Sequence, residues 1–434
     1  MLNGRDKVCK KRTLTKKLIT ALGIILLVVP MVLCTGEPIC AAAASLPRYK
    51  REEDGVWRLK SRKGKNSKKD DKTELKTQEE QNEIHGQKTA VCMFTGDLMC
   101  LKGQQYDAGK KGRYDFSPSF SYVKPIFKTS DFVCANLETL ISESNPLTRN
   151  QLEENEQPQC NGPKAYLSAL KKAGFDMLVT ANNHTCDWGP EGITETKKQL
   201  DETGFANVGT HYNAEGDAAG ERFSVFDVNG IKIAVLSYTH HMNQRAKMTS
   251  DEMTAMVHLF SKEAVKSDIA DAREKGADFV VVYLHYGSEN VLEANSTQVR
   301  DSDYVAEAGA DLIIGSHPHC LQPCKYIKTS DGRKVLCMYS LGNFVSSMAR
   351  DINNDTLILR VEITKKTEKK KTTIKMTDAS YIPCKVMARN GAQFVVTPTN
   401  AELNGGIRGK SLSEARERIG AVMGGVIPEY SVKQ

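Results

Sequence analysis

The chain has 434 residues, 40% of them hydrophobic and 26% charged, which is an ordinary globular composition with material for a large buried core. The formal net charge is +7, but residues 1–87 carry the whole of that positive excess. A nucleic-acid-binding protein needs its basic excess on the folded domain, so we exclude that class. The basic amino-terminal region is instead typical of a segment that sets the orientation of a protein in the membrane and of a spacer that follows it.

The first segment, residues 1–44, has the pattern of a signal anchor. Seven Lys and Arg residues precede an apolar run over residues 18–34, and small residues follow at 41–45. Positive charge before an apolar segment keeps the amino terminus in the cytoplasm and sends the rest of the chain outward. We therefore expect a single-pass membrane protein with an extracytoplasmic main domain. The alternative is a signal peptide cleaved near residues 41–45, which would give a secreted protein.

Residues 45–87 are dominated by Lys, Glu, Asp, Ser and Gln and predict a charged, disordered linker. Nine of the twelve cysteines lie beyond residue 44. Cys92, Cys134 and Cys337 fall in apolar, strand-like runs and are predicted to be small buried residues. The odd number of cysteines assigns no disulfide pairing. A structural zinc site is not expected, because the chain has no two C-x2-C pairs.

The main domain, residues 88–402, begins where the character of the sequence changes. Short apolar runs with β-branched residues predict strands, and amphipathic runs between them, with Gly just past the end, predict helices. The predicted strands are 89–97, 131–138, 175–184, 232–240, 279–287, 311–319 and 335–344. The predicted helices are 163–173, 190–202, 261–275 and 298–308.

Strands that alternate with helices favour a largely parallel sheet covered by helices. Residues 356–364 and 372–387 predict strands without helices and hence an antiparallel, β-rich C-terminal extension, with a charged turn at 365–371. Residues 403–434 are predicted to be a C-terminal tail. The fold class is therefore α/β, with central mixed sheets flanked by helices.

Polar residues suited to metal or proton chemistry recur where the predicted strands end. In open α/β sheets, ligands bind outside the carboxyl ends of the strands. His317 and His319 lie two residues apart, so in an extended chain both rings face the same side. The full set consists of Asp97, Asn136, Glu138, Asn182, Asn183, His184, His285, His317, His319 and Asn343.

Each of these residues alone has a plain structural explanation, such as a turn aspartate or a hydrogen-bonded histidine, and we leave His240 and His241 at that interpretation. Together the set indicates a metal site. Oxygen, amide and imidazole ligands without matched cysteines suit Mn, Fe or Zn, and the site would hold one or two divalent ions.

The same residues carry a family resemblance. Their motifs, in this order over about residues 90–350, resemble those of the CapA-type poly-gamma-glutamate capsule biosynthesis proteins. That resemblance implies a metallophosphatase-like fold and a place in membrane machinery that makes or exports the polymer. The motifs are FTGD (94–97), ANLE (135–138), ANNH (181–184), HYG (285–287), GSHPH (315–319) and SLGNF (340–344).

A more distant resemblance to calcineurin-like phosphoesterases implies individual roles. It makes Asp97, Glu138, Asn183, His285, His317 and His319 the metal ligands and His184 an acid or transition-state stabiliser. We add Asn182 as a catalytic candidate, and Asn136, Asn343 and Tyr286 as candidates for substrate binding or for support of the ligands. The sequence departs from the Asp-x-His pattern of those enzymes, since Leu98 and Met99 follow Asp97.

Two classes of function remain open. The first is a metal-dependent hydrolase or transferase that acts on poly-gamma-glutamate or a cell-wall substrate outside the membrane, with a phosphoesterase as a variant of that hypothesis. The second is a non-catalytic assembly or export component that binds the anionic polymer beside a membrane synthase complex. The recurring His, Asn and Glu residues favour the enzyme, whereas the absent histidine after Asp97 favours the assembly role.

Overall fold

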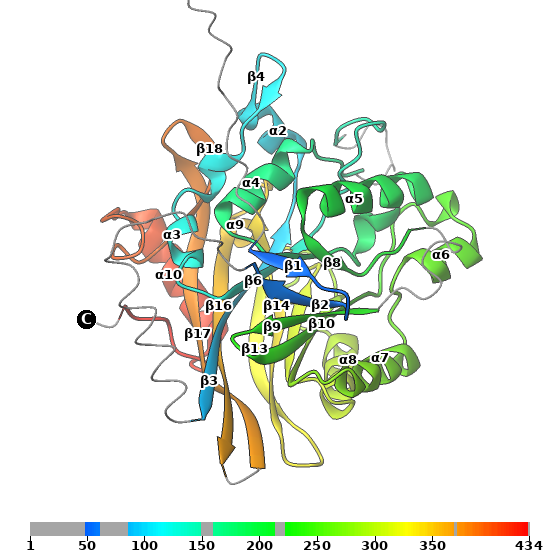
Figure 1. Cartoon of the computed structure of the whole chain (residues 1–434). Coiled ribbons are helices and arrows are strands. Elements are labelled where there is room, and N and C mark those ends of the chain that lie inside the picture. Colours follow the sequence, from blue (N-terminus) through cyan, green and yellow to red (C-terminus); the bar gives the residue numbers. More distant parts are fainter. Residues whose placement is uncertain (1–47, 61–85, 149–158, 213–221, 369–370, 433–434) are drawn as a thin grey trace, which may run out of the picture. The chain divides into compact units, whose positions relative to one another are not determined.

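The computed structural model describes residues 48–60, 86–148, 159–212, 222–368 and 371–432. The predicted signal anchor lies outside these residues. No helix within the described part of the chain has the length and apolar character needed to cross a membrane. Two large mixed sheets organise the described residues (Figure 1).

The first sheet has the strand order β1-β2-β9-β10-β11-β12-β14-β13. Strands β10, β11, β12 and β14 run parallel to one another, and antiparallel partners flank them. The bounds are β1 (Tyr49–Arg51), β2 (Val56–Leu59), β9 (Phe223–Val228), β10 (Ile231–Thr239), β11 (Phe279–His285), β12 (Leu312–Ser316), β13 (Leu321–Lys328) and β14 (Lys334–Leu341).

The second sheet has the order β18-β17-β16-β3-β6-β7-β8, with β15 beside β3. Strands β3, β6, β7 and β8 are parallel, and the three C-terminal strands extend the sheet in antiparallel fashion. The bounds are β3 (Gln87–Leu98), β6 (Phe132–Leu137), β7 (Met177–Val179), β8 (Ala206–Val208), β15 (Asn343–Val345), β16 (Asp355–Glu368), β17 (Lys371–Arg389) and β18 (Ala392–Pro398). A small hairpin joins β4 (Gly109–Lys110) to β5 (Arg113–Tyr114).

Helices cover the outer face of each sheet. Apolar residues of α3, α4 and α5 pack with those of β3 and β6, and residues of α7 and α8 pack with those of β10 and β11. The helices are α2 (Lys102–Ala108), α3 (Lys124–Phe127), α4 (Ala165–Ala173), α5 (Gly189–Thr203), α6 (Ser250–Met256), α7 (Lys262–Glu274), α8 (Ser296–Glu307), α9 (Asp351–Asn354) and α10 (Lys410–Met423). Short 3-10 turns are η1 (Ser117–Phe120), η2 (Asn183–Cys186) and η3 (Arg245–Lys247).

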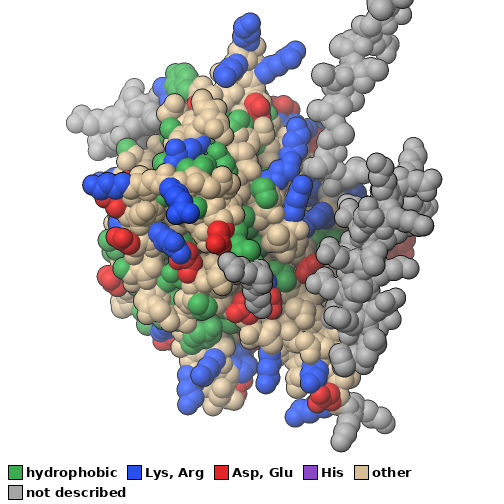
Figure 2. All heavy atoms as spheres, turned by 90° about the vertical axis from the view of Figure 1, so that its left-hand side faces the viewer, with side chains coloured by type: hydrophobic (Ala, Val, Ile, Leu, Met, Phe, Trp, Pro, Cys, Tyr) green, Lys and Arg blue, Asp and Glu red, His purple; other side chains and the backbone are tan. Residues whose placement is uncertain are grey.

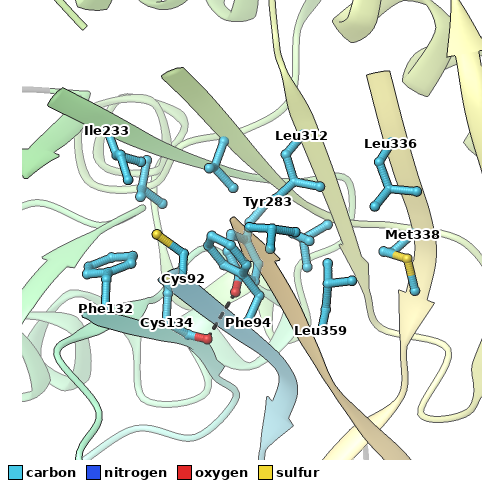
Figure 3. Packing of buried hydrophobic residues seen from close by; sticks show 14 of the residues in the cluster. Cys92, Phe94, Phe132, Cys134, Ile233, Tyr283, Leu312, Leu336, Met338 and Leu359 are labelled. Carbon is cyan, nitrogen blue, oxygen red and sulfur yellow. Dashed lines mark hydrogen bonds between the residues drawn. The ribbon is translucent and has the colours of Figure 1, made fainter. Parts of the chain in front are cut away.

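The inner faces of the two sheets pack against each other and form the main core (Figure 3). Phe94 and Phe132 of the second sheet lie 6.3 Å apart between ring centroids, and Phe94 lies 6.4 Å from Tyr283 of the first sheet. The hydroxyl of Tyr283 donates to the carbonyl oxygen of Cys134 at 3.2 Å, so one buried polar group ties the sheets together. Alternate residues of each strand face this core because side chains alternate across a strand.

The layered α/β fold predicted from the sequence, with central mixed sheets flanked by helices, is confirmed, as is its antiparallel C-terminal extension. The three named cysteines are buried, and all nine described cysteines are free thiols. The sequence prediction missed the strands β4, β5, β8, β9, β13 and β18 and the helices α2, α3, α6 and α9. The predicted strand over 175–184 is shorter than expected, because η2 begins at Asn183 and carries the polar residues in a turn.

The prediction of a disordered linker over 45–87 is wrong for residues 48–60, which form the β1–β2 hairpin at the edge of the first sheet. Trp57 stacks on Phe226 at 5.9 Å, and the Tyr49 ring meets Phe226 edge-on at 5.3 Å. Arg48 donates through Nε to Asp176 Oδ1 at 2.9 Å. Two aromatic contacts with Phe226 and one half-buried ion pair therefore order a segment whose composition alone indicates disorder.

The C-terminal segment 403–434 also differs from the expected tail. Helix α10 contributes Ile419 and Met423 to the core between the sheets. Beyond it, Tyr430 N donates to the carbonyl oxygen of Tyr381 in β17 at 2.8 Å. The described end of the chain is thus an integral part of the domain.

Candidate metal centre

Five of the predicted site residues meet where the parallel strands of both sheets end. Asp97 lies near the end of β3 and Glu138 follows β6, while His285 ends β11. Their ligand atoms form two overlapping groups, within each of which all the atoms lie within 4.8 Å of one another. One group is Asp97, Glu138 and His319, and the other is Glu138, His285 and His317.

Glu138 belongs to both groups and is fully buried. Its Oε1 lies 3.6 Å from His285 Nε2 and 3.8 Å from His319 Nε2. Neither carboxyl oxygen has a hydrogen-bond partner among the described residues. A buried unpartnered polar group costs about 1–3 kcal/mol, and more when it is charged, so this carboxylate fits a position that a cation neutralises.

Asp97 is also fully buried, and its two oxygens have different partners. Oδ1 accepts from Asn136 Nδ2 at 2.7 Å, and Oδ2 accepts from the backbone N–H of His317 at 3.3 Å. The same Oδ2 lies 3.8 Å from His319 Nδ1. The hydrogen bonds fix the carboxylate while Oδ2 remains directed towards the histidines.

His285 lies between β6 and β12 residues at the centre of the site. Its Nδ1 is 2.9 Å from Ser316 Oγ, and its Nε2 is 2.9 Å from Asn183 Oδ1. Asn183 therefore brings an amide oxygen to the same atom that faces Glu138. This places the predicted amide ligand beside the predicted histidine and carboxylate ligands.

His317 and His319 adopt positive φ angles of 96° and 57°, which L-residues rarely occupy. Strain of this kind persists only where the surroundings impose it, and it gathers at functional sites. His317 Nδ1 is buried and has no hydrogen-bond partner among the described residues. His319 Nδ1 is 2.9 Å from Asn343 Oδ1, which orients that ring.

Burial controls protonation at this centre. It raises the pKa of Glu138 well above its usual value, and neighbouring Asp97 raises it further. Burial also raises the pKa of Asp97, although His319 opposes the shift. Burial and the neighbouring histidines lower the pKa of His285 well below its usual value and that of His317 to about 2. The imidazoles of His285 and His317 are thus neutral, as metal ligands must be.

These residues fit one or two divalent cations. Two positions share Glu138: one lies among Asp97, Glu138 and His319, and the other among Glu138, His285 and His317. The donors are carboxylate, imidazole and amide groups, the set that Mn, Fe and Zn accept. The unpartnered oxygens of Glu138 are the observation that makes the fit specific.

His184 sits on η2 next to this centre and has its own support. Its Nδ1 is 2.7 Å from Asp187 Oδ2, an oxygen that also accepts from the backbone N–H of Cys160 at 2.6 Å. Its Nε2 faces Cys160 Sγ at 3.8 Å. Burial opposes a protonated ring, but Cys160 and Asp187 outweigh it and raise the pKa of His184 well above its usual value. A carboxylate-backed histidine of this kind can hold and deliver a proton.

The remaining asparagines act as supports. Asn182 caps η2 by accepting from His184 N–H at 3.1 Å, and its Nδ2 donates to the carbonyl oxygen of Leu137 at 2.8 Å. Its amide is thereby committed to positioning the turn that carries His184. Asn343 Nδ2 donates to Ser346 Oγ at 3.0 Å while its Oδ1 faces His319.

The expectation that Tyr286 lies at the site is wrong. Consecutive strand residues face opposite sides, so the inward direction of His285 sends Tyr286 outward. Its ring is buried in the apolar cluster beneath α7 and α8, and its hydroxyl is 2.7 Å from Ser302 Oγ of α8.

Sequence reasoning missed Asp187, Ser316, Cys160 and the part played by His241. The His241 ring stacks on that of His317 with centroids 4.5 Å apart, and its Nε2 is 3.0 Å from the carbonyl oxygen of Gly287. The sequence did contain one indication of the role of Asp187. It lies three residues after His184, and one helical turn brings residues with this spacing onto the same side. Cys160 had no such signal because it approaches from a separate loop.

Comparison with known proteins gives this geometry a family. The model of "Bacterial capsule synthesis protein PGA_cap" matches residues 91–348, which include the whole candidate centre. The chain belongs to the PGA_cap family. It is 31% identical over 274 residues to the PGA biosynthesis protein CapA of Bacillus subtilis (strain 168), covering 63% of this chain and 67% of that protein. It is 29% identical over 260 residues to the capsule biosynthesis protein CapA of Bacillus anthracis, covering 58% and 59%.

Solved structures similar to this member of the PGA_cap family include an NAD nucleotidase and a calcineurin-like phosphoesterase. The NAD nucleotidase NadN of Haemophilus influenzae is 10% identical, with a TM-score of 0.43 over 78% of this chain and 56% of that chain. The calcineurin-like phosphoesterase YfkN of Bacillus subtilis is 12% identical, with a TM-score of 0.40 over 76% and 96%.

Proposed function

We propose that this PGA_cap protein is a membrane-anchored, extracytoplasmic capsule biosynthesis enzyme that hydrolyses or transfers poly-gamma-glutamate with one or two divalent transition metal ions. The membership of a capsule synthesis family supports the polymer, and the predicted anchor over residues 18–34 supports the location. The observation that carries the metal chemistry is Glu138, a fully buried carboxylate with no hydrogen-bond partner among the described residues, beside three buried histidines.

The residues have separable tasks in this proposal. Asp97, Glu138, Asn183, His285, His317 and His319 hold the cation. A divalent cation would polarise a scissile carbonyl or phosphoryl group and stabilise the negative charge that develops on it. His184, oriented by Asp187 at 2.7 Å, would give its Nε2 proton to the leaving group. Water, for hydrolysis, or the acceptor group of a second molecule, for transfer, would attack the polarised group, and burial of the site's side chains strengthens each of these electrostatic interactions.

A specific observation favours a second function, that of a non-catalytic assembly component that binds the anionic polymer. Leu98 and Met99 stand after Asp97, where the Asp-x-His pattern has its histidine, and both are buried apolar residues. That position therefore gives the site no ligand, and the second cation position depends on Glu138, Asn183, His285 and His317.

Metal content and polymer chemistry together test the enzyme. We expect the purified full chain to bind about one or two equivalents of Mn, Fe or Zn by mass spectrometry. His317→Ala should lose metal, whereas His184→Ala should keep it and still fail to form or cleave polymer. Tyr286→Phe is the matched control, because it removes only the hydroxyl contact with Ser302 on the far side of β11.

Two results would contradict the enzyme. One is the absence of any bound or titratable transition metal in the wild-type chain. The other is normal polymer formation and cleavage by folded His184→Ala and His317→Ala proteins, which would establish the assembly role instead.

A further inference from the structure

A hollow on the helix-covered side of the second sheet is lined by basic side chains from three separate segments. Arg48 lies just before β1, Lys124 begins α3, Lys128 directly follows α3, and Lys171 and Lys172 belong to α4. Figure 2 views the molecule from the left of Figure 1, where α3 lies, and shows Lys and Arg side chains standing out from that face.

The positive charge of the hollow is largely uncompensated. Asp176 is the one acidic residue of its lining, and Arg48 already binds it. Lys124, Lys128 and Lys172 are exposed, and none of them forms an ion pair with a described carboxylate. Such a surface attracts anions by simple electrostatics, and more strongly at low salt.

Lys171 adds a second, independent sign of an anion site. It is buried, and burial lowers its pKa to about 8 despite the attraction of Asp176. Its ammonium group donates to the carbonyl oxygen of Gly204 at 2.9 Å and lies 4.2 Å from the centre of the Phe205 ring. A negative charge in the hollow would stabilise the charged form of this lysine, which burial otherwise disfavours.

The hollow includes Arg48, which lies four residues after the last residue of the predicted anchor. Arg48 is the first described residue, and its Nη1 donates to the carbonyl oxygen of Ser130 at 2.8 Å, just before β6. The apolar and small-residue segment of the anchor extends to Ala44. Four residue steps separate Ala44 from Arg48, so about 14 Å is the most that the chain can span between them.

The candidate metal centre lies at the opposite end of the same strands. Arg48 contacts residues that precede β6 and β7, whereas Glu138 follows β6 and Asn182 follows β7. Strand β6 has six residues, which correspond to about 20 Å. A surface that meets the hollow would therefore hold the centre facing away from it.

We propose that this basic hollow docks onto anionic phospholipid headgroups at the outer surface of the membrane and holds the metal centre turned away from the bilayer, towards the polymer. The proposal rests on the membrane anchoring proposed above. The short tether to the anchor favours lipid over polymer as the occupant, since it keeps the hollow within about 14 Å of the anchor's end.

Lysine labelling of the full chain in lipid nanodiscs tests the docking. We expect an amine-reactive acylating reagent to label Lys124, Lys128 and Lys172 at least about three-fold more slowly in phosphatidylglycerol discs than in phosphatidylcholine discs. Lys266 is the internal control, because it is exposed on α7, which covers the other sheet. The protection should disappear at about 0.5 M salt while the chain stays with the discs.

A charge-reversed variant provides the second measurement. Lys124→Glu/Lys128→Glu/Lys172→Glu changes only exposed side chains, so folding should be retained. In the wild type we expect Lys171 also to be labelled more slowly in phosphatidylglycerol than in phosphatidylcholine discs, and in this variant the two rates should be equal. Lys266→Glu is the matched control variant.

Each adverse outcome has a distinct meaning. Equal labelling in both kinds of disc overturns the docking but leaves the proposed membrane anchor intact. Protection of these lysines by soluble poly-gamma-glutamate in phosphatidylcholine discs also overturns the docking, because it would make the hollow a polymer-binding site. Failure of the chain to float with either disc contradicts the anchor, and the docking with it.

Discussion

Replacing Glu138 by glutamine should change the stability of the protein in opposite directions with and without metal. In the metal-free protein the carboxylate is buried without a hydrogen-bond partner among the described residues and lies against Asp97. A glutamine amide can donate to Asp97 at any pH, whereas the Glu138 side chain can do so only when it is protonated, which its raised pKa favours. With metal present, the same change removes the ligand that both cation positions share.

The expected size follows from the cost of the unpartnered group. Relief of about 1–3 kcal/mol is the range for one buried unsatisfied polar group. Unfolding entropy is about 2.1 cal/mol/K per residue, or roughly 0.8 kcal/mol/K for the unit Ala44–Gln434. At a pH above the raised pKa of Glu138, where the carboxylate is ionised, metal-free Glu138→Gln should therefore melt about 1–4 °C above the metal-free wild type. Metal at 100 times its Kd adds about 2.7 kcal/mol to a protein that binds it, which is about 3 °C here.

Differential scanning calorimetry of the full chain in detergent, after chelation and again with saturating Mn²⁺, measures both effects. The wild type should gain Tm with metal, and Glu138→Gln should gain little or nothing. Glu143→Gln is the matched control, because Glu143 is exposed and lies outside the site. A metal-free variant that melts below the wild type, or one that responds to metal as the wild type does, would refute the argument.

Two further predictions concern the fold around the site. Arg48→Ala leaves Asp176 buried without its cation and should lower the free energy of unfolding by about 3 kcal/mol in urea titrations, and a loss below about 1 kcal/mol would show that the hairpin is not held by this pair. Gly96→Ala would place a Cβ 1.9 Å from the carbonyl oxygen of Gly342 and should destabilise the protein by more than about 4 kcal/mol, seen as lost soluble yield. Gly409→Ala, whose Cβ would meet nothing within 4 Å, should be neutral, and equal yields of the two alanine variants would contradict the close approach of β3 and the turn before β15.

The strand ends were predictable because each is marked locally. An apolar run that stops at a carboxylate, amide or imidazole is visible without knowledge of the partner strands. Asp97, Glu138, His285 and His317 were found in this way, and the structure brings their ligand atoms together. Glycines just past the ends of amphipathic runs are an equally local signal, and they predicted the ends of four helices to within a few residues.

Other features depend on contacts between distant segments. Composition predicts disorder for residues 48–60, but docking of Trp57 on Phe226 and of Arg48 on Asp176 orders them. Tyr286 was predicted to be a site residue because it follows His285. In the structure, its side chain points to the opposite face of the sheet from that of His285.

The sequence alone determined the α/β character, the order of the polar strand ends and the chemistry of the donors, because these reside in short stretches of chain. The tertiary structure decided that two sheets bring these ends to one centre and that Asp187 and Cys160 flank His184. It also decided that Glu138 stands between two ligand groups with no hydrogen-bond partner among the described residues. Whether a buried polar group has a hydrogen-bond partner depends on all the residues packed around it, and these come from distant parts of the chain. A local sequence pattern therefore cannot predict it.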